Sequence, residues 1–184
     1  MDLTNEAPGK DWHCVRLLGW GGAAALLCVP LIATQFTREV AWTLGDFVFA
    51  AMMLGGVGLA IELAVRISPN ASYRIAAGLG LAASVMLIWV TGAVGYIGSE
   101  ENPYNLAFLG VVAIAFAGSI IAAFRPLGMA YAMLAAGIAH AIAGIGGAPA
   151  EPRTLIITVV FLGLWFGSAR LFQLSAMEAK AEAD

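Results

Sequence analysis

Residues 105–124 read NLAFLGVVAIAFAGSIIAAF, a stretch that is apolar on every side of a helix and holds no charged residue. A helix rises about 1.5 Å per residue, so a stretch of this length is about 30 Å long and matches the hydrocarbon core of a bilayer. Strands of a membrane barrel would instead alternate apolar and polar residues. The stretch therefore predicts a helix that spans a membrane.

Similar apolar stretches flank it on both sides, and the expected spans are 17–36, 42–65, 74–97, 105–124, 128–147 and 154–174. Hydrophobic residues make up 61% of the chain and charged residues only 11%, against roughly 25% charged in a soluble domain. Short connections make consecutive helices antiparallel neighbours. We therefore expect an all-α, polytopic transmembrane bundle of six helices. It forms a single domain over 1–184, with a short N-terminal segment 1–16 and a C-terminal tail 176–184.

The basic residues predict the orientation, because Lys and Arg are enriched on the cytoplasmic side of membrane proteins. With the N-terminus inside, only Arg38 and Arg153 of the nine basic residues lie outside. Acidic residues dominate the expected outer side: Glu39, Asp46, Glu100, Glu101 and Glu151. Both termini are therefore expected in the cytoplasm.

Small residues recur every fourth position along the fifth span. Lipid provides little hydrophobic force between helices, so membrane helices associate by close backbone approach over Gly and Ala. The residues expected to pack against a neighbouring helix are Gly128, Ala132, Ala136, Gly144, Gly163 and Gly167. One face of the fifth span is thus expected to press against protein.

His140 lies deep in the fifth span, about 18 Å from its cytoplasmic end. An imidazole at this depth can ligate a metal, a haem iron or the magnesium of a chlorin. Ala136, one turn earlier, would let a flat macrocycle approach the backbone, and this spacing is similar to that of bacterial light-harvesting helices. The alternative is a neutral histidine that is hydrogen-bonded to a carbonyl or hydroxyl group of the next helix.

Acidic side chains supply the candidates for coupling to a proton or an ion. Glu62 precedes Arg66 by one turn, the favourable order for a helix-surface pair, and Arg66 can extend to water and bring the carboxylate with it. A proton-carrying or ion-binding Glu62 is the alternative. Asp46 lies in the first turn of its span, where capping by Thr43 or Trp42 and the helix dipole favour a negative charge.

The outer loop 100–105 holds the densest group of polar residues. Pro103 is suited to start a helix and Asn102 to cap it. Capping accounts for most of this pattern. A cation site built from Glu100, Glu101 and Asn105 is the alternative, because hard cations prefer oxygen ligands.

Several classes of function have no support in the sequence. It contains no phosphate-binding loop, no cysteine pair at zinc spacing, no nucleophile elbow and no basic groove for nucleic acid. Asp46 and Glu62 lie about 160° apart around a helix, so they cannot face one cavity. We therefore expect neither an enzyme nor a metal site, and no nucleic-acid partner.

The middle of the chain resembles a family of small bacterial multi-pass membrane proteins that has no assigned activity. The similarity covers roughly residues 40–130. It is carried by Trp42, Asp46-Phe47, Gly58-Leu59, Glu62-Leu63, Arg66, Tyr73-Arg74, Trp89 and the run IGSEENPYN at 97–105. The resemblance implies a bacterial inner (cytoplasmic) membrane protein and no particular chemistry.

These observations favour a non-enzymatic membrane protein that acts as an accessory or packing subunit, in a homo-oligomer or in a larger complex such as a respiratory or photosynthetic one. The alternative is a small transporter or channel coupled to protons or ions through Glu62 or His140. A third interpretation is a haem- or chlorin-binding protein that uses His140. The expected partners are lipid and other membrane subunits or further copies of the chain, and the sequence does not specify a cofactor.

Overall fold

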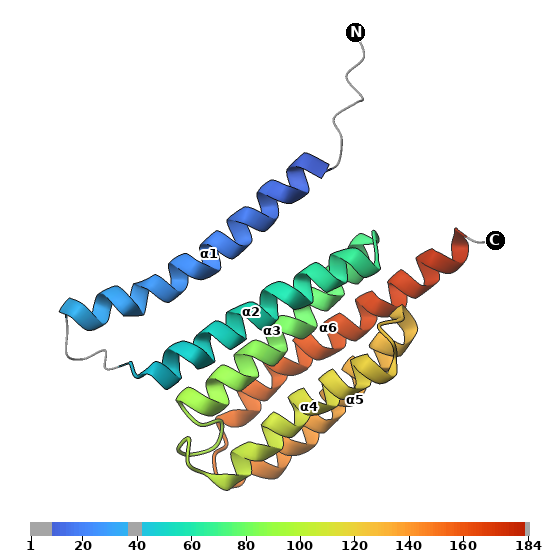
Figure 1. Ribbon diagram of the computed structural model, residues 1–184. Helices are drawn as coiled ribbons and strands as arrows, with labels where there is room; N and C mark the ends of the chain where they lie inside the picture. Colours follow the sequence, from blue (N-terminus) through green and yellow to red (C-terminus); the bar gives the residue numbers. More distant parts are fainter. Residues whose placement is uncertain (1–8, 37–41, 183–184) are drawn as a thin grey trace. The chain divides into compact units, whose positions relative to one another are not determined.

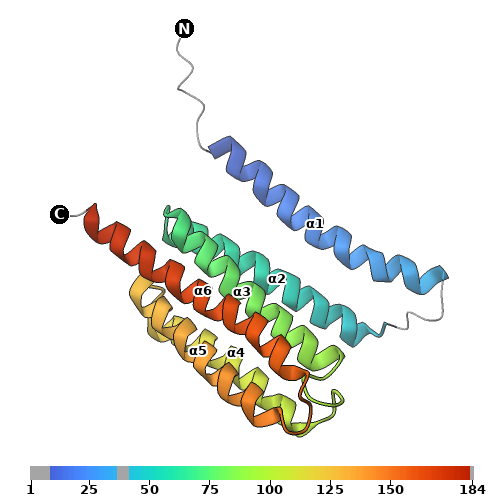
Figure 2. The same ribbon diagram turned by 180° about the vertical axis from the view of Figure 1, so that it is seen from behind.

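The structure is a computed structural model that describes residues 9–36 and 42–182, with side chains from residue 16 onward. Arg38 and Glu39, which entered the expected orientation, lie outside the described residues, as does the side chain of Lys10. The described residues form α-helices and one short 3-10 helix, without a strand, as Figure 1 and the reverse view in Figure 2 show. The elements are α1 (Gly9–Phe36), α2 (Leu44–Ile67), α3 (Ala71–Ala93), η1 (Pro103–Asn105), α4 (Leu106–Ile121), α5 (Pro126–Gly147) and α6 (Thr154–Ala181).

Among the described residues, six helices are long and apolar enough to cross a membrane. They correspond to the six expected spans, which confirms the expected all-α fold. The chain is therefore a multi-pass integral membrane protein.

Several helix ends differ from the expected spans. α1 begins at Gly9 and not at residue 17, and α4 ends at Ile121 and not at residue 124. α3 ends at Ala93 and not at residue 97, because Gly95 and Gly98 take left-handed conformations with φ of 82° and 68° and turn the chain back. α6 continues to Ala181, so most of the expected tail is helical. Residues 176–181 are mostly Ala, Met, Glu and Lys, which are good helix formers. Glu178 also accepts hydrogen bonds from the side chains of Asn70 at 2.8 Å and Ser72 at 3.3 Å, which fixes this last part of α6 against the start of α3.

The chain divides into two compact units, Met1–Ala60 and Ile61–Asp184, and the boundary falls inside α2. We call them unit 1 and unit 2. The expectation that the chain forms a single domain stays a prediction. In unit 1, the ring of Trp20 on α1 lies so close to Gly58 on α2 that a β-carbon there would be 2.9 Å from the ring. No residue of the α1 span is buried.

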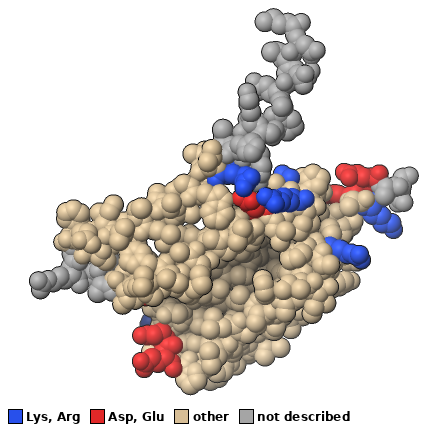
Figure 3. Space-filling model, viewed as in Figure 1, with Lys and Arg blue, Asp and Glu red and all other residues tan. Residues whose placement is uncertain are grey.

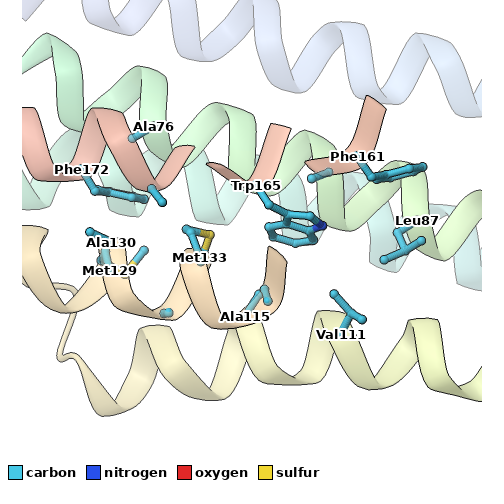
Figure 4. Packing of buried hydrophobic residues seen from close by; sticks show 14 of the residues in the cluster. Ala76, Leu87, Val111, Ala115, Met129, Ala130, Met133, Phe161, Trp165 and Phe172 are labelled. Carbon is cyan, nitrogen blue, oxygen red and sulfur yellow. The ribbon is translucent and has the colours of Figure 1, made fainter. Parts of the chain in front are cut away.

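Unit 2 contains α3 to α6, and consecutive helices run in opposite directions (Figure 1). α5 packs against α4 and α6, and α6 packs against α3. Half of the α5 span is buried. Large side chains such as Trp165 and Phe172 fill the core between these helices (Figure 4). The outward faces of the helices are also apolar, as contact with lipid requires.

Charged side chains gather at the two ends of unit 2 (Figure 3). The end that holds the α2–α3 and α4–α5 connections carries most of the basic residues: Arg66, Arg74, Arg125, Arg170 and Lys180. The opposite end carries Glu100, Glu101 and Glu151 together with Arg153. We call it the acidic end.

Candidate functional site

A buried group of polar side chains lies near the acidic end of unit 2. The hydroxyl oxygen of Tyr96 is 3.1 Å from Nε2 of His140 and 3.1 Å from Oγ1 of Thr158. These residues come from the loop 94–102, from α5 and from α6, and at most 3% of each is exposed. We call Tyr96, His140 and Thr158 the polar cluster; it is the candidate functional site.

The loop 94–102 places Tyr96 in the cluster because its backbone is fixed from two sides. The amide of Ile97 donates a hydrogen bond to Oδ1 of Asn105 at 2.9 Å, and Nδ2 of Asn105 donates to the carbonyl of Ser99 at 2.8 Å. A β-carbon at Gly95 would lie 2.5 Å from the carbonyl oxygen of Ser99. Only glycine fits a turn that is this tight and left-handed.

Two glycines of α5 make room for the cluster. A β-carbon at Gly144 would lie 2.7 Å from Cγ2 of Thr158, and one at Gly147 would overlap the side chain of Ile97. The small residues near the end of α5 therefore admit a polar group from α6 and an apolar anchor from the loop.

Aromatic rings enclose the cluster. His140 stacks on Phe161 with ring centroids 5.0 Å apart, and Tyr96 stacks on Phe108 at 3.9 Å. Burial raises the pKa of Tyr96 above its ordinary value of 10.0, although the hydrogen bond with Thr158 acts in the opposite direction. Tyr96 is therefore a neutral phenol at physiological pH and can donate one hydrogen bond while it accepts others.

Three buried polar atoms of unit 2 have no hydrogen-bond partner among the described residues. They are Nδ1 of His140, Oγ1 of Thr91 and the indole nitrogen of Trp165. Such atoms are uncommon in the interior of a protein.

His140 is thus hydrogen-bonded to a hydroxyl group, and the hydroxyl comes from the loop 94–102 and not from the neighbouring helix. Ala136 is fully buried in the helix contacts of α5. The imidazole of His140 is in contact with other rings: Phe161 stacks on it, and Phe108 meets it edge-on with centroids 5.5 Å apart. Ligation of a haem or chlorin by His140 stays a prediction.

The acidic residues of α2 lie away from the cluster in sequence and have local partners. Oδ2 of Asp46 accepts hydrogen bonds from the backbone amide of Thr43 at 2.7 Å and from its hydroxyl at 2.8 Å. Glu62 pairs with Arg66 at 3.3 Å, where the Arg66 side chain is 68% exposed. Both residues therefore take part in the local interactions that helix geometry favours.

At the acidic end, Glu100 and Glu101 are exposed. Oδ1 of Asn102 accepts a hydrogen bond from the amide of Tyr104 at 3.0 Å, so Asn102 caps the helical turn that Pro103 begins. The side chain of Asn105 is hydrogen-bonded to the backbone of the loop, at Ile97 and Ser99. Within the described part of the chain, no group of three His, Cys, Asp or Glu residues is close enough to hold a metal ion.

The small residues expected in helix contacts divide into two sets. Ala132, Ala136 and Gly144 are buried, and a β-carbon at Gly128 would lie 2.7 Å from that of Ala122. A β-carbon at Gly167 would lie 3.7 Å from Cδ1 of Leu79. Gly163 is exposed, and no described atom comes within 4 Å of the place its β-carbon would take. Its expected packing role is therefore absent within unit 2.

Sequence reasoning selected His140 but missed Tyr96 and Thr158. The expected span 74–97 places Tyr96 at the end of a continuous helix. The glycines on either side, at 95 and 98, are the signal that could have placed it in a tight loop.

The chain matches no protein-family model, no curated protein and no solved structure. The fold and the apolar helices therefore define its class, a multi-pass membrane protein.

Proposed function

We propose that the protein is a non-enzymatic subunit of a membrane assembly, formed by several copies of itself or by a larger complex. One observation carries the proposal: five glycines of α1 and α2 have no close neighbour within unit 1. No described atom lies within 4 Å of the place that a β-carbon would take at Gly19, Gly21, Gly22, Gly55 and Gly56.

Glycine in a helix costs about 1 kcal/mol relative to alanine, so glycines are expected there mainly where they bring another backbone close. In unit 2, Gly118, Gly128 and Gly144 do this, whereas Gly78, Gly92, Gly110 and Gly163 have no described atom within 4 Å of the place of a β-carbon. The five glycines named above have no such neighbour within unit 1, in contrast to Gly58, which lies against Trp20. If a helix of another subunit packed against α1 and α2, these glycines would allow its backbone to approach closely.

The acidic residues support a structural role. Asp46 caps α2 and Glu62 pairs with Arg66. Each of these roles serves the helices themselves and requires no substrate.

Native mass spectrometry of the chain, extracted from its own membrane in a mild detergent, tests the proposal. We expect masses above the 19.1 kDa of one chain, either multiples of that mass or a complex with other proteins. A protein that is only ever found as a single chain with lipid would contradict the proposal.

We also propose that the membrane is a bacterial inner membrane and that both termini are cytoplasmic. The resemblance of residues 40–130 to bacterial membrane proteins and the basic residues at one end of unit 2 support this. A reporter enzyme fused to the C-terminus tests the orientation. Activity of a periplasmic reporter at this position would contradict it.

A small transporter coupled to protons or ions is a second candidate, and the polar cluster is the observation that favours it. Polar and ionisable groups inside a membrane often mark transport paths. Flux into liposomes under a pH gradient separates the candidates, with His140→Gln and Glu62→Gln as the test variants. If Glu62→Gln left the fold intact and abolished a measured flux, the structural role of Glu62 would fail and transport would become the leading function.

A haem- or chlorin-binding protein that uses His140 is the third candidate. Its test is the absorption spectrum of the protein purified from its native membrane, from the near ultraviolet to the near infrared. A haem or chlorin band that is lost in His140→Gln would establish it.

A further inference from the structure

We infer that the loop 94–102 is a plug, which closes the acidic end of unit 2 and separates His140 from the water at that end. The loop joins α3 to η1 at the end where α6 begins (Figure 1). Two of its residues, Tyr96 and Ile97, are only 3% and 2% exposed, whereas residues 98–101 are exposed. The loop therefore reaches into the bundle with two side chains and then returns to the surface.

The side chain of Ile97 is the apolar anchor of the plug. A β-carbon at Gly147, the last residue of α5, would overlap this side chain, so Ile97 lies directly against the backbone of α5. The hydroxyl of Tyr104, in η1, donates a hydrogen bond to the carbonyl of Ala143 at 2.9 Å. The loop and the helical turn that follows it are thus both attached to the last turns of α5.

Tyr96 reaches further in and provides a hydroxyl group where a water molecule could otherwise bridge two polar groups. Its oxygen is 3.1 Å from Nε2 of His140 and 3.1 Å from Oγ1 of Thr158, which are ordinary hydrogen-bond distances. A phenol, like water, can both donate and accept. Polar groups inside a membrane need a partner, and the plug provides this partner in the place of water.

Aromatic rings complete the closure around the hydroxyl group of Tyr96. The ring of Tyr96 stacks on Phe108 with centroids 3.9 Å apart and lies 6.0 Å from the ring of Phe161. Phe161 in turn stacks on the imidazole of His140 at 5.0 Å. Withdrawal of the loop would remove both the ring and the hydroxyl of Tyr96 from this group, and His140 would then be open toward the acidic end.

The backbone of the plug is held as one piece. Asn105, which is 3% exposed, accepts a hydrogen bond from the amide of Ile97 at 2.9 Å and donates one to the carbonyl of Ser99 at 2.8 Å. Gly95, at the start of the loop, has a φ of 82°. Hinges are a few loop residues that absorb changes of φ and ψ, and glycine has the widest range of both. Rotation at Gly95 would therefore withdraw Tyr96 and Ile97 together.

The plug goes beyond the proposed subunit role and does not depend on it. Replacing buried polar partners by apolar groups of the same shape can be neutral or stabilising, so permanent closure of this end would not require a polar cluster. A loop that withdraws does require one, because His140 and Thr158 then exchange the hydroxyl of Tyr96 for water. The plug thus gives the polar cluster a use as a gate for water.

Exchange of hydrogen for deuterium at the C2 carbon of histidine tests the inference, because it requires contact between the imidazole ring and water. The full chain in lipid nanodiscs is incubated in deuterium oxide and digested. Mass spectrometry then distinguishes His140 from His13, the other histidine. We expect exchange at His140 to be severalfold slower in the wild type than in the unfolded protein. Equal rates in the two samples would overturn the inference.

Two variants release the plug without changing the polar cluster. Ile97→Ala removes the apolar anchor and Asn105→Ala removes the bonds that hold the loop backbone, and each should accelerate exchange at His140 severalfold. Met133→Ala is the matched control, since it also truncates a buried apolar side chain that is 4% exposed. Met133 lies on α5 about two turns nearer the basic end than His140. This control should leave the exchange at His140 as slow as in the wild type.

Two results with these variants would overturn the inference. If Ile97→Ala and Asn105→Ala both left exchange at His140 as slow as in the wild type, the loop would not be what closes this end. If Met133→Ala accelerated exchange as strongly as they do, the effect would be a general loosening of the core.

If the loop variants failed to fold, backbone amide exchange of the wild type would decide. The bond from the amide of Ile97 to Oδ1 of Asn105 predicts that this amide is protected. Protection of the amide together with slow exchange at His140 supports the plug. Exchange of the Ile97 amide at the rate of the unfolded chain would overturn it.

Discussion

α1 and α5 are both apolar, glycine-rich helices of membrane-spanning length, yet they differ completely in burial. No residue of the α1 span is buried, whereas half of the α5 span is. On α5 the small residues repeat every fourth position, and Gly128, Ala132 and Gly144 of this repeat meet Ala122, Gly118 and Thr158. On α1 they are clustered at 19–25 as GWGGAAA. Hydropathy thus shows where a helix crosses the membrane, while the spacing of small residues shows which face packs within the bundle.

The largest expected effect comes from filling the packed face of α5. Ala136→Leu places a large side chain where no space is left, because Ala136 is 0% exposed. We expect the free energy of unfolding to fall by about 1–3 kcal/mol, as measured by thermal unfolding in detergent. The control is Ala135→Leu, an exposed neighbour on the same helix. Equal stability of the two variants would show that the Ala136 face meets lipid.

A somewhat smaller effect is expected where the loop 94–102 turns back into the bundle. Gly95→Ala adds a β-carbon at a φ of 82° and against the Ser99 carbonyl. We expect a loss of about 1–2 kcal/mol, the usual penalty for a left-handed residue other than glycine. Gly92→Ala, in the last turn of α3 with open space around it, should be neutral or slightly stabilising. The loop would not be the fixed element described here if both variants behaved alike.

The hydroxyl of Tyr96 tests how far the polar cluster contributes to the packed region. Tyr96→Phe leaves Nε2 of His140 and Oγ1 of Thr158 without this partner. We expect a loss of about 1–2 kcal/mol, the usual penalty for leaving buried polar atoms unsatisfied. Tyr131→Phe is the matched control because Tyr131 is 59% exposed. An equally small change in both would mean that the cluster does not stabilise the fold.

The sequence was sufficient for the six spans because each is an apolar run of membrane length. It was insufficient at the end of α3, where Tyr96 and Ile97 continue the apolar run while Gly95 and Gly98 reverse the backbone. A hydropathy pattern contains no information on the backbone φ angle, so it does not predict this reversal. The extension of α6 was missed for a different reason, since the bonds of Glu178 to Asn70 and Ser72 join residues that are distant in sequence.

The candidate site could be predicted only in part. His140 is conspicuous as an imidazole inside an apolar span. Its partner Tyr96 lies 44 residues away and Thr158 is 62 residues from Tyr96. Pairs at such separations follow from tertiary packing, which no local pattern of residues specifies.

The smallest expected effect lies at the Glu62–Arg66 pair. Arg66→Gln removes a charge that is 68% exposed, and exposed ion pairs contribute about 1 kcal/mol or less. We expect thermal stability to be nearly unchanged, in contrast to Ala136→Leu. A loss comparable to that of Ala136→Leu would mean that the pair is part of the packed region.

The contrast between α1 and α5 is tested most directly by comparing Gly22→Leu with Ala136→Leu, using native mass spectrometry and thermal unfolding on the same samples. We expect Gly22→Leu to dissociate the assembly to single chains of 19.1 kDa and to leave the stability of the single chain unchanged. Ala136→Leu should lower that stability. An assembly that is unaffected by Gly22→Leu, or a wild-type protein that is a single chain from the start, would contradict a subunit role for α1.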